Sequence, residues 1–488
     1  MDWERDGITR RAALSRGFGA VALVCSFDFD RRTRATGKRT SAYARAAQSR
    51  PFQPFQRDVP IPPVARPVAQ SRALQQYVLT MKPGTADILP GLQTPILGYD
   101  GLYPGPTIKA TRGRAVEIRQ VNRSGRSLNV HLHGGVTPPE FDGHPHDAIP
   151  DGTERLYKYP NVQRQATLWY HDHAHGETAR TLFAGLAAFY LVDDPDDEAL
   201  ELPRGDYDVP LMIQDRSFNA DGSFRYRVDL DRGFRGDTIL VNGAIAPRMQ
   251  VERRLYRLRF LNAANARAFT LALGNNRPMT QIASDGGLLP KPVRRTSIPL
   301  EPAERVDVVI DFRDFGVGSK IVLHNVGGEP TTQAVMRFDV VRGRREEARV
   351  PKVLADQEPL PPVNAQRSWP LTFQGLGTSM WQIANGGFDE MRIDCRPRQG
   401  STELWTWTNN SQRTHPMHLH GYHFRVVSTN GKRRHPGDAG WKDTVAVYPN
   451  ETVVVRPYFD YFPGRYVFHC HAAEHGDMSM MGQMEVVA

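Results

Sequence analysis

The amino-acid sequence predicts an all-β protein built from three consecutive Greek-key β-sandwiches. The chain has 488 residues, enough for three domains of ordinary size, and 40% of them are hydrophobic. Its 42 glycines and 37 prolines suit many short strands joined by turns. Several segments alternate apolar and polar residues with a period of two, and no long amphipathic helix is visible. Together these observations favour sandwiches of Greek-key type.

Three segments show the strand pattern most clearly. Residues 306–310 (VDVVI) and 404–408 (LWTWT) are predicted strands. In residues 256–260 (YRLRF) we expect the apolar side chains to face the core and the two arginines to face water.

Two shifts in composition divide the chain at about residues 200 and 350. Residues 193–207 are acidic, and residues 342–368 are charged and then rich in proline. The middle part contains a single histidine, His324. We therefore expect the middle domain to act as a spacer between the outer domains and to form part of the wall of the substrate site. The predicted domains are 51–200, 201–350 and 351–488.

Residues 1–50 are predicted to be an export signal and disordered leader. Thr9-Arg10-Arg11 precedes an uncharged, mostly apolar run over residues 17–27, a pattern that resembles a twin-arginine signal. The run is too short to span a membrane, so no stable membrane anchor is expected. We therefore expect the protein to be exported to the periplasm, the cell surface or the medium.

The high positive charge of the chain is not evidence for nucleic-acid binding, and no nucleic-acid partner is expected. The leader holds eleven Lys/Arg and five Asp/Glu, which is +6 of the total +9. The three cysteines form no disulfide framework: Cys25 lies in the leader, Cys470 lies between two histidines, and Cys395 has no partner.

Four clusters of histidines point to metal binding. Imidazole and thiolate side chains are suitable ligands for copper. The clusters hold ten of the sixteen histidines, one cysteine and a methionine: His131 and His133; His171 and His173; His415, His418 and His420; and His469, Cys470, His471, His475 and Met480.

The last of these clusters can serve two sites. If residues 466–472 form a strand, His469 and His471 point to one face and Cys470 to the other. Cys470 then completes one copper site while its neighbours reach another copper group. Its backbone becomes a path for electrons between them.

A blue, or type 1, copper needs two imidazoles, a thiolate and a weak axial sulfur. His415, Cys470, His475 and Met480 supply that set. The other eight histidines form four pairs with i, i+2 spacing, which suit three further coppers.

From about residue 70 onward the sequence resembles the multicopper oxidases, the laccase family. The segments around Trp169 and around Asp142-Gly143-His144-Pro145 look most like the spore-coat laccase and bilirubin oxidase branch. The resemblance implies three cupredoxin-like domains with a trinuclear copper cluster between the first and third. It also implies a type 2 copper on His131 and His418. The type 3 pair is implied on His133, His171, His173, His420, His469 and His471.

The resemblance further implies the reaction. A small aromatic reducing substrate gives electrons to the type 1 copper through the edge of His475 or His415, and dioxygen is reduced to water. Asp142 matches an acid of the spore-coat branch and is expected to deliver protons; the alternative is that it only orients a histidine. Gly476 stands where relatives often carry a second acid, and Glu474 and Asp477 are possible substitutes.

Six histidines fit no ligand position and are expected to lie beside the ligands or in solvent: His144, His146, His175, His324, His423 and His435. The predicted enzyme is a monomeric laccase-like oxidase of phenols, aminophenols or bilirubin-like pigments. The main alternative is a cuprous-ion or manganese oxidase, although no methionine-rich insert is visible. A copper-storage protein does not need the Cys470 bridge, and a structural cupredoxin that has lost its ligands does not fit a complete set.

Overall fold

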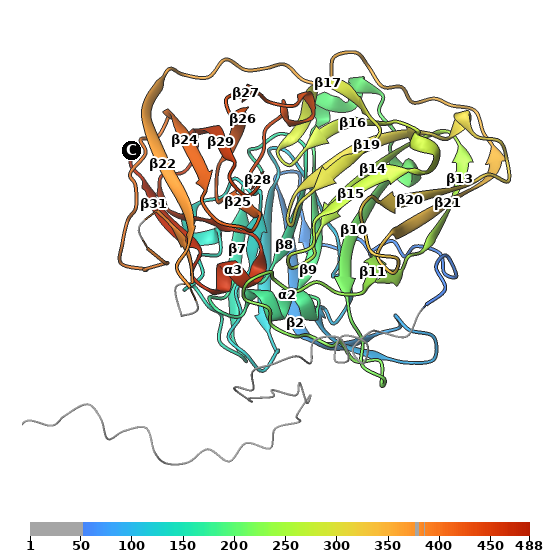
Figure 1. Ribbon diagram of the computed structural model, residues 1–488, viewed down its shortest axis with the longest axis horizontal. Helices are drawn as coiled ribbons and strands as arrows, with labels where there is room; N and C mark the ends of the chain where they lie inside the picture. Colours follow the sequence, from blue (N-terminus) through green and yellow to red (C-terminus); the bar gives the residue numbers. More distant parts are fainter. Residues whose placement is uncertain (1–51, 376–379, 385) are drawn as a thin grey trace, which may run out of the picture. The chain divides into compact units, whose positions relative to one another are not determined.

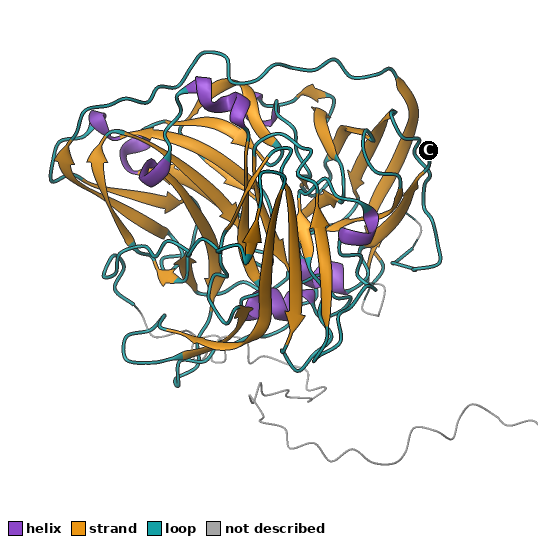
Figure 2. Cartoon of the chain, turned by 180° about the vertical axis from the view of Figure 1, so that it is seen from behind, coloured by secondary structure: helices purple, strands orange, loops and turns teal. Residues whose placement is uncertain are grey.

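The structure is a computed structural model that describes residues 52–375, 380–384 and 386–488. The predicted leader and its Cys25 lie outside the described residues. Strands dominate the regular structure and the helices are short (Figure 1, Figure 2). The strands form six sheets, which pair around three separate apolar cores. The prediction of three Greek-key β-sandwiches is confirmed.

The first sandwich packs a five-stranded sheet against a four-stranded sheet. In β5 the buried Val116 and Ile118 alternate with more exposed residues, as expected of a strand with one face on the core. The five-stranded sheet consists of β1 (Ala69–Gln70), β2 (Leu74–Ala86), β3 (Thr94–Tyr99), β5 (Ala115–Asn122) and β7 (Glu154–Tyr159). The four-stranded sheet consists of β4 (Ile108–Thr111), β9 (Ala187–Asp193), β8 (Ala166–His171) and β6 (His131–His133).

The middle sandwich is formed by a seven-stranded and a five-stranded sheet. The seven-stranded sheet has the order β12 (Ala244–Ile245), β11 (Thr238–Val241), β10 (Asp208–Arg216), β14 (Leu255–Asn262), β19 (Arg305–Asp311), β16 (Met279–Ser284) and β17 (Gly287–Arg295). The five-stranded sheet has the order β13 (Arg248–Arg253), β21 (Ala334–Gly343), β20 (Lys320–Asn325), β15 (Phe269–Leu273) and β18 (Ile298–Leu300). The predicted strand 306–310 lies within β19.

The third sandwich is formed by a six-stranded and a four-stranded sheet. The six-stranded sheet has the order β23 (Trp381–Ile383), β22 (Val363–Phe373), β24 (Thr402–Asn409), β29 (Thr452–Tyr458), β26 (His423–Thr429) and β27 (Lys432–Arg433). The four-stranded sheet has the order β28 (Thr444–Val447), β25 (His415–Leu419), β30 (Gly464–Cys470) and β31 (Met481–Val486). The predicted strand 404–408 lies within β24. The predicted strand 466–472 corresponds to β30, which ends at Cys470.

The strands of the three sandwiches therefore fall within residues 69–193, 208–343 and 363–486. The domain boundaries near residues 200 and 350 stay predictions.

The expectation that the arginines of residues 256–260 face water is wrong. β14 lies between β10 and β19, and both Arg257 and Arg259 are buried. Arg259 donates to both carboxylate oxygens of Asp208 at 2.6 Å, and Arg257 Nε donates to Asp307 Oδ2 at 3.0 Å. Because these ion pairs compensate for lost hydration, the arginines can occupy a covered face of the sheet. The alternation of apolar residues and arginines in a sequence does not show whether the arginines are solvated or are buried in ion pairs.

Helices are short throughout the part of the chain that the structure describes. The α-helices are α2 (Thr178–Ala184) and α3 (Ala473–Asp477). The 3-10 helices are η1 (Pro139–Phe141), η2 (Pro195–Leu200), η3 (Gly205–Tyr207), η4 (Gly274–Asn276), η5 (Phe312–Asp314) and η6 (Pro436–Asp438). Within the described ranges, no helix has the length and apolar character that a membrane crossing requires.

Candidate metal centre

Two pairs of neighbouring strands carry the predicted ligands. In the first sandwich β6 pairs with β8, so that His131 lies opposite His171. In the third sandwich β25 pairs with β30, so that His418 lies opposite His469. The rings from the two sandwiches are buried and in mutual contact. We call this group the eight-histidine cluster: His131, His133, His171, His173, His418, His420, His469 and His471.

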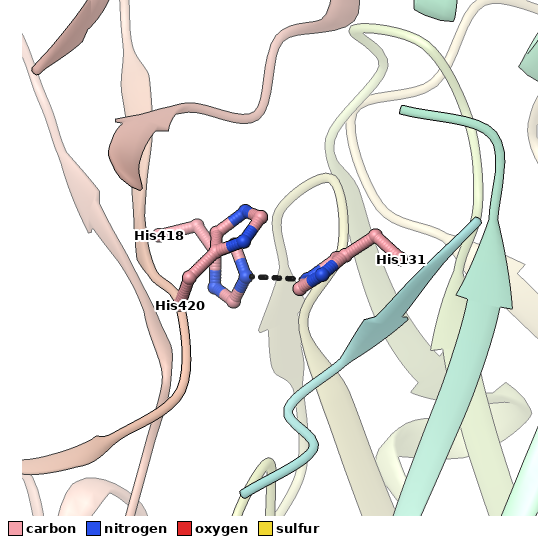
Figure 3. A group of neighbouring side chains, drawn as sticks. All are labelled: His131, His418 and His420. Atoms are coloured by element: carbon pink, nitrogen blue, oxygen red, sulfur yellow. Dashed lines mark hydrogen bonds between the residues drawn. The ribbon is translucent and has the colours of Figure 1, made fainter. Parts of the chain in front are cut away.

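His131 and His418 meet across the two sandwiches (Figure 3). Their Nε2 atoms lie 3.3 Å apart. Nδ1 of His131 donates to the Asp142 carbonyl at 2.7 Å, and Nδ1 of His418 lies 2.9 Å from the Asp443 carbonyl. Because a neutral imidazole has a single N–H, both Nε2 atoms present lone pairs to each other. Two lone pairs at this distance repel unless a cation lies between them.

Nε2 of His469 likewise lies close to the Nε2 atoms of two further histidines. Its Nε2 lies 3.1 Å from Nε2 of His173 and 3.1 Å from Nε2 of His420. Nδ1 of His469 donates to the Cys470 carbonyl at 3.0 Å, and Nδ1 of His420 donates to Asp142 Oδ2 at 2.8 Å. Lone pairs of His469 and His420 therefore point toward a common space.

Several other ring nitrogens of the cluster are buried without a hydrogen-bond partner: Nδ1 of His133, Nε2 of His171, Nδ1 of His173 and both nitrogens of His471. Leaving a buried polar atom unpaired costs free energy, so unpaired groups of this kind call for a ligand. Imidazole nitrogens suit copper, zinc, iron and nickel. The residues present therefore fit a group of bound metal ions.

Burial favours the neutral, metal-binding form of seven histidines of this cluster by lowering the pKa of each. Burial, together with the neighbouring histidines, lowers the pKa of His171 and of His469 to about 3. The pKa values of five others are also held well below the usual value: His131, His133, His173, His420 and His471.

The second predicted site forms around Cys470. Its Sγ lies 3.5 Å from Nδ1 of His415 and 3.7 Å from Nδ1 of His475. The outer nitrogens of the two rings are already bonded, His415 Nε2 with the Ser411 hydroxyl at 2.8 Å and His475 Nε2 with the Asp231 carbonyl at 3.1 Å. Both inner nitrogens therefore remain available next to the sulfur, and the set could hold one metal ion.

Met480 is buried in the same apolar core as Cys470. Its carbonyl accepts from the Cys470 backbone N–H at 3.0 Å, and its N–H donates to the His475 carbonyl at 3.1 Å. The backbone thus fixes Met480 next to Cys470 and His475. Its role as axial ligand stays a prediction.

Trp381 covers this second site, which the sequence pattern did not indicate. Its ring lies 4.4 Å from that of His475 and 5.0 Å from that of His415, between ring centroids. Its Nε1 donates to the Leu230 carbonyl at 2.8 Å. The edge of His475 that was expected to meet the substrate is consequently below the surface, with 1% exposure.

Comparison with known proteins agrees with this geometry. Three multicopper oxidase family models match residues 80–197, 169–321 and 363–488. The laccase of Bacillus subtilis (strain 168) is 35% identical over 88% of this chain and 97% of that protein. The bilirubin oxidase of Albifimbria verrucaria is 35% identical over 96% of this chain and 87% of that protein.

The chain belongs to the multicopper oxidase family. The predicted resemblance to the multicopper oxidases is thus confirmed. Membership of this family also confirms the predicted class of enzyme, a copper-dependent oxidoreductase that uses oxygen as acceptor. Among solved structures, a Campylobacter jejuni multicopper oxidase described as a metallo-oxidase superposes with a TM-score of 0.82. It is 28% identical, and the match covers 91% of this chain and 98% of that one.

Asp142 of this multicopper oxidase lies between the sandwiches. Its Oδ2 accepts from His420 Nδ1 and its backbone carbonyl accepts from His131, whereas its buried Oδ1 has no hydrogen-bond partner among the described residues and lies 3.7 Å from His131 Nδ1. Burial raises the pKa of this carboxyl well above its usual value. The geometry is compatible both with proton delivery and with orienting His420.

Gly476 borders a small cavity of about 20 Å³ that reaches four histidines of the cluster. This volume suits roughly one water molecule, which needs about 10–15 Å³. Asp477 also lines the cavity, and burial raises its pKa well above the usual value. Glu474 instead points toward Tyr226 and Asn265, from which Oε1 accepts hydrogen bonds at 2.8 Å and 2.9 Å.

Asp443 is a residue of this oxidase that the sequence reasoning missed. Its Oδ1 lies 3.1 Å from His133 Nε2, so it contacts one ring of the cluster directly. Burial alone would raise its pKa, but the Arg305 guanidinium and His133 hold it well below the usual range. The sequence carries no motif that marks Asp443, which the structure places immediately before β28.

Other residues set aside in the sequence lie outside the ligand groups. His144 Nε2 bonds with Gln483 Oε1 at 2.8 Å, and His423 Nε2 donates to the Gly134 carbonyl at 3.0 Å. Cys395 is a buried free thiol of the third sandwich whose pKa is raised by burial.

Proposed function

We propose that this multicopper oxidase is laccase-like and couples the one-electron oxidation of phenolic, aminophenolic or bilirubin-like donors to the four-electron reduction of dioxygen to water. The observation that carries the proposal is the position of Cys470. Its sulfur faces His415 and His475, while its sequence neighbours His469 and His471 belong to the eight-histidine cluster. A protein that only stores copper has no need for a direct covalent link between two sites.

We assign four copper ions to these residues. His415, Cys470, His475 and Met480 would hold the type 1 copper, and His131 and His418 the type 2 copper. The type 3 pair would be held by His133, His171, His173, His420, His469 and His471. The close contacts between histidine nitrogens of the two sandwiches support this division.

Copper, when bound, supplies the one-electron redox chemistry and the reduction of dioxygen. The chain supplies the rest. Cys470 links the two sites covalently through its backbone, and burial lowers the pKa of seven histidines of the eight-histidine cluster. Asp142 holds an ionisable carboxyl next to His420, where it can supply a proton. Asp477 is the better placed of the two substitutes for the acid absent at Gly476, because it lines the cavity beside the cluster.

The donor is proposed to be a small aromatic reductant. A methionine axial ligand lowers the reduction potential of a type 1 copper relative to a non-ligating residue, which favours easily oxidised donors. A cuprous-ion or manganese oxidase is the second candidate, because a similar structure from Campylobacter jejuni is described as a metallo-oxidase. The substrate profile separates the two candidates.

Three further proposals complete the assignment. The sandwiches are domains with bounds 51–200, 201–350 and 351–488. The enzyme acts as a monomer, and it is exported by the twin-arginine route. Gel filtration of the copper-loaded protein and cell fractionation with an Arg10→Lys/Arg11→Lys variant test the last two.

The decisive experiment combines a metal count with an oxygen electrode. The copper-loaded protein should contain four coppers per chain, show an intense thiolate-to-copper absorption band, and consume oxygen with a phenol such as 2,6-dimethoxyphenol. A His324→Ala variant serves as the control, since His324 lies in the middle sandwich away from both groups of ligands. One copper per chain without the band would refute the proposal. Oxygen uptake with Cu(I) or Mn(II) but with no phenol would favour the second candidate.

A further inference from the structure

Arg305 is a fully buried residue of the middle sandwich that uses all five of its N–H donors. Nε donates to the Thr167 carbonyl at 2.9 Å. The terminal nitrogens donate to the carbonyls of Ala303 and Asp285 at 3.0 and 3.1 Å, and to both carboxylate oxygens of Asp443, one of them at 2.8 Å. Only arginine offers five donors in a rigid fork, so lysine cannot reproduce this set.

These contacts join all three sandwiches. Arg305 begins β19 of the middle sandwich, and Thr167 lies in β8 of the first, the strand that ends at His171. Asp443 immediately precedes β28 of the third sandwich. The middle sandwich was expected to act as a spacer. Its Arg305 side chain nevertheless binds Asp443, which in turn contacts His133 of the cluster.

Asp443 and Thr444 together hold one ring from each outer sandwich. His133 Nε2 lies 3.1 Å from Asp443 Oδ1 and 3.2 Å from the Thr444 hydroxyl. His418 Nδ1 lies 2.9 Å from the Asp443 carbonyl and 3.3 Å from the same hydroxyl. The His133 and His418 rings are stacked with centroids 3.7 Å apart. One dipeptide therefore sets the orientation of both rings.

Gly134, which directly follows His133, leaves the room that this arrangement needs. Its φ is +79°. A Cβ atom built on it would lie 2.5 Å from a terminal nitrogen of Arg305 and 2.6 Å from Asp443 Oδ2. The glycine of the His-Leu-His-Gly motif thus allows the backbone to approach the ion pair.

We propose that Arg305 is a positioning residue of the metal centre, through which the middle sandwich fixes His133 and His418 by way of Asp443. The inference rests on the proposed assignment of these two histidines to copper. Partners that orient the ligands of a metal typically change metal affinity or activity by about 10–100-fold when they are removed. The competing reading is an ordinary buried ion pair that contributes to folding alone.

The test compares Arg305→Lys with Arg259→Lys. Arg259 lies in the same sheet, is 1% exposed and binds both oxygens of Asp208 at 2.6 Å, but contacts no histidine in the described structure. Both variants keep the positive charge and remove a bidentate contact. Arg305→Leu is added to remove the charge as well. The measurements are the type 2 copper EPR signal, copper retained against a chelator, and thermal unfolding of the copper-free proteins.

We expect Arg305→Lys to lose copper from the cluster about 10–100-fold more readily than the parent. Its type 2 EPR signal should broaden or disappear, while the absorption band of the Cys470 site persists as an internal control. Arg259→Lys should lower thermal stability to a similar extent and keep the parent signal. Arg305→Leu should show at least the same loss of copper as Arg305→Lys.

The inference is overturned if Arg305→Lys keeps the parent type 2 signal and copper retention, whatever its stability. It is also overturned if both lysine variants lose all coppers alike, or if Arg305→Lys does not fold, because either result assigns the pair to folding. A parent protein that binds no copper would refute the proposed function instead, so the two failures are distinguishable.

Discussion

The carboxylate of Asp142 and the imidazole of His420 join the first and third sandwiches through a hydrogen bond of 2.8 Å. The acid therefore contacts Nδ1 of a cluster histidine whose Nε2 lies 3.1 Å from Nε2 of His469. Its second oxygen, Oδ1, is buried, has no hydrogen-bond partner among the described residues and lies 3.7 Å from His131 Nδ1. This pairing leaves one oxygen for orienting His420 and one for carrying a proton.

Asp142→Asn should separate these two roles. The amide oxygen can still accept from His420, so copper content and reduction of the blue site should hardly change. Without an ionisable group, reoxidation by dioxygen should slow by about 10²–10⁴-fold, and the acid limb of the pH profile should move. Stopped-flow reoxidation of the fully reduced protein measures the effect. Asp147→Asn is the control, since Asp147 is a more exposed acid paired with Arg155. Equal reoxidation rates in Asp142→Asn and parent would assign Asp142 to orientation alone.

Cys470→Ser should abolish the blue absorption band and the oxidase activity together. Serine cannot replace the thiolate that binds copper, and the same sulfur lies on the path between the two sites. Absorption spectroscopy and oxygen uptake check the two losses. Cys395→Ser, at the other buried free thiol, should leave the band unchanged. A variant at Cys470 that kept its colour would contradict the ligand assignment.

His418→Ala should damage oxygen reduction while the blue site stays reducible by substrate. His418 lies three residues from His415, but its ring stacks on His133 in the other group. Anaerobic reduction of the blue absorption band by substrate, followed by mixing with air, measures the two half-reactions separately. Reoxidation as fast as in the parent would make the assignment wrong.

The copper-free protein should lose stability as the pH falls below about 6.5. Burial lowers the pKa of His171 and His469 to about 3 and of His475 to about 4, from 6.5. The unfolded chain therefore binds more protons in this window. The contribution of these buried, neutral histidines to the free energy of unfolding is fully present above pH 6.5. As the pH falls below 6.5, this contribution decreases by up to roughly 1.4 kcal/mol per pH unit for each histidine.

Urea unfolding of the copper-free protein at pH 7.5, 6.0 and 5.0 checks this expectation. The copper-loaded protein should show a smaller slope near pH 6, because bound metal keeps the imidazoles deprotonated. A pH-independent midpoint for the copper-free protein would show that these rings are not buried neutral groups.

The sequence was sufficient to predict the fold class and to point to the histidines and the cysteine that the structure brings into buried groups. Of the four i, i+2 histidine pairs, His131 and His133 lie wholly within a strand, β6, whereas β8, β25 and β30 each end between the two histidines of a pair. It failed where chemistry depends on long-range pairing. No residue near Arg257 in the sequence indicates that it forms an ion pair with Asp307 of a neighbouring strand. Solvent exposure of Arg257 was therefore the natural expectation.

The same reason explains the missed residues of the site. Arg305 and Asp443 are 138 residues apart and carry no motif of their own. Trp381 also lies far from His475 in sequence, and an isolated tryptophan usually indicates core packing. Local patterns reveal ligands, whereas the groups that support ligands are selected by the tertiary structure.

The cover over His475 has a consequence for selectivity. Leu230 and Asp231, from the loop between β10 and β11, and Trp381 separate both imidazoles of this site from solvent. The proposed donor would therefore contact these covering residues and not the imidazole rings, and its electron would have to tunnel through them. We expect the rate to follow driving force and tunnelling distance more than shape complementarity, so chemically unrelated reductants of similar potential should be oxidised at similar rates.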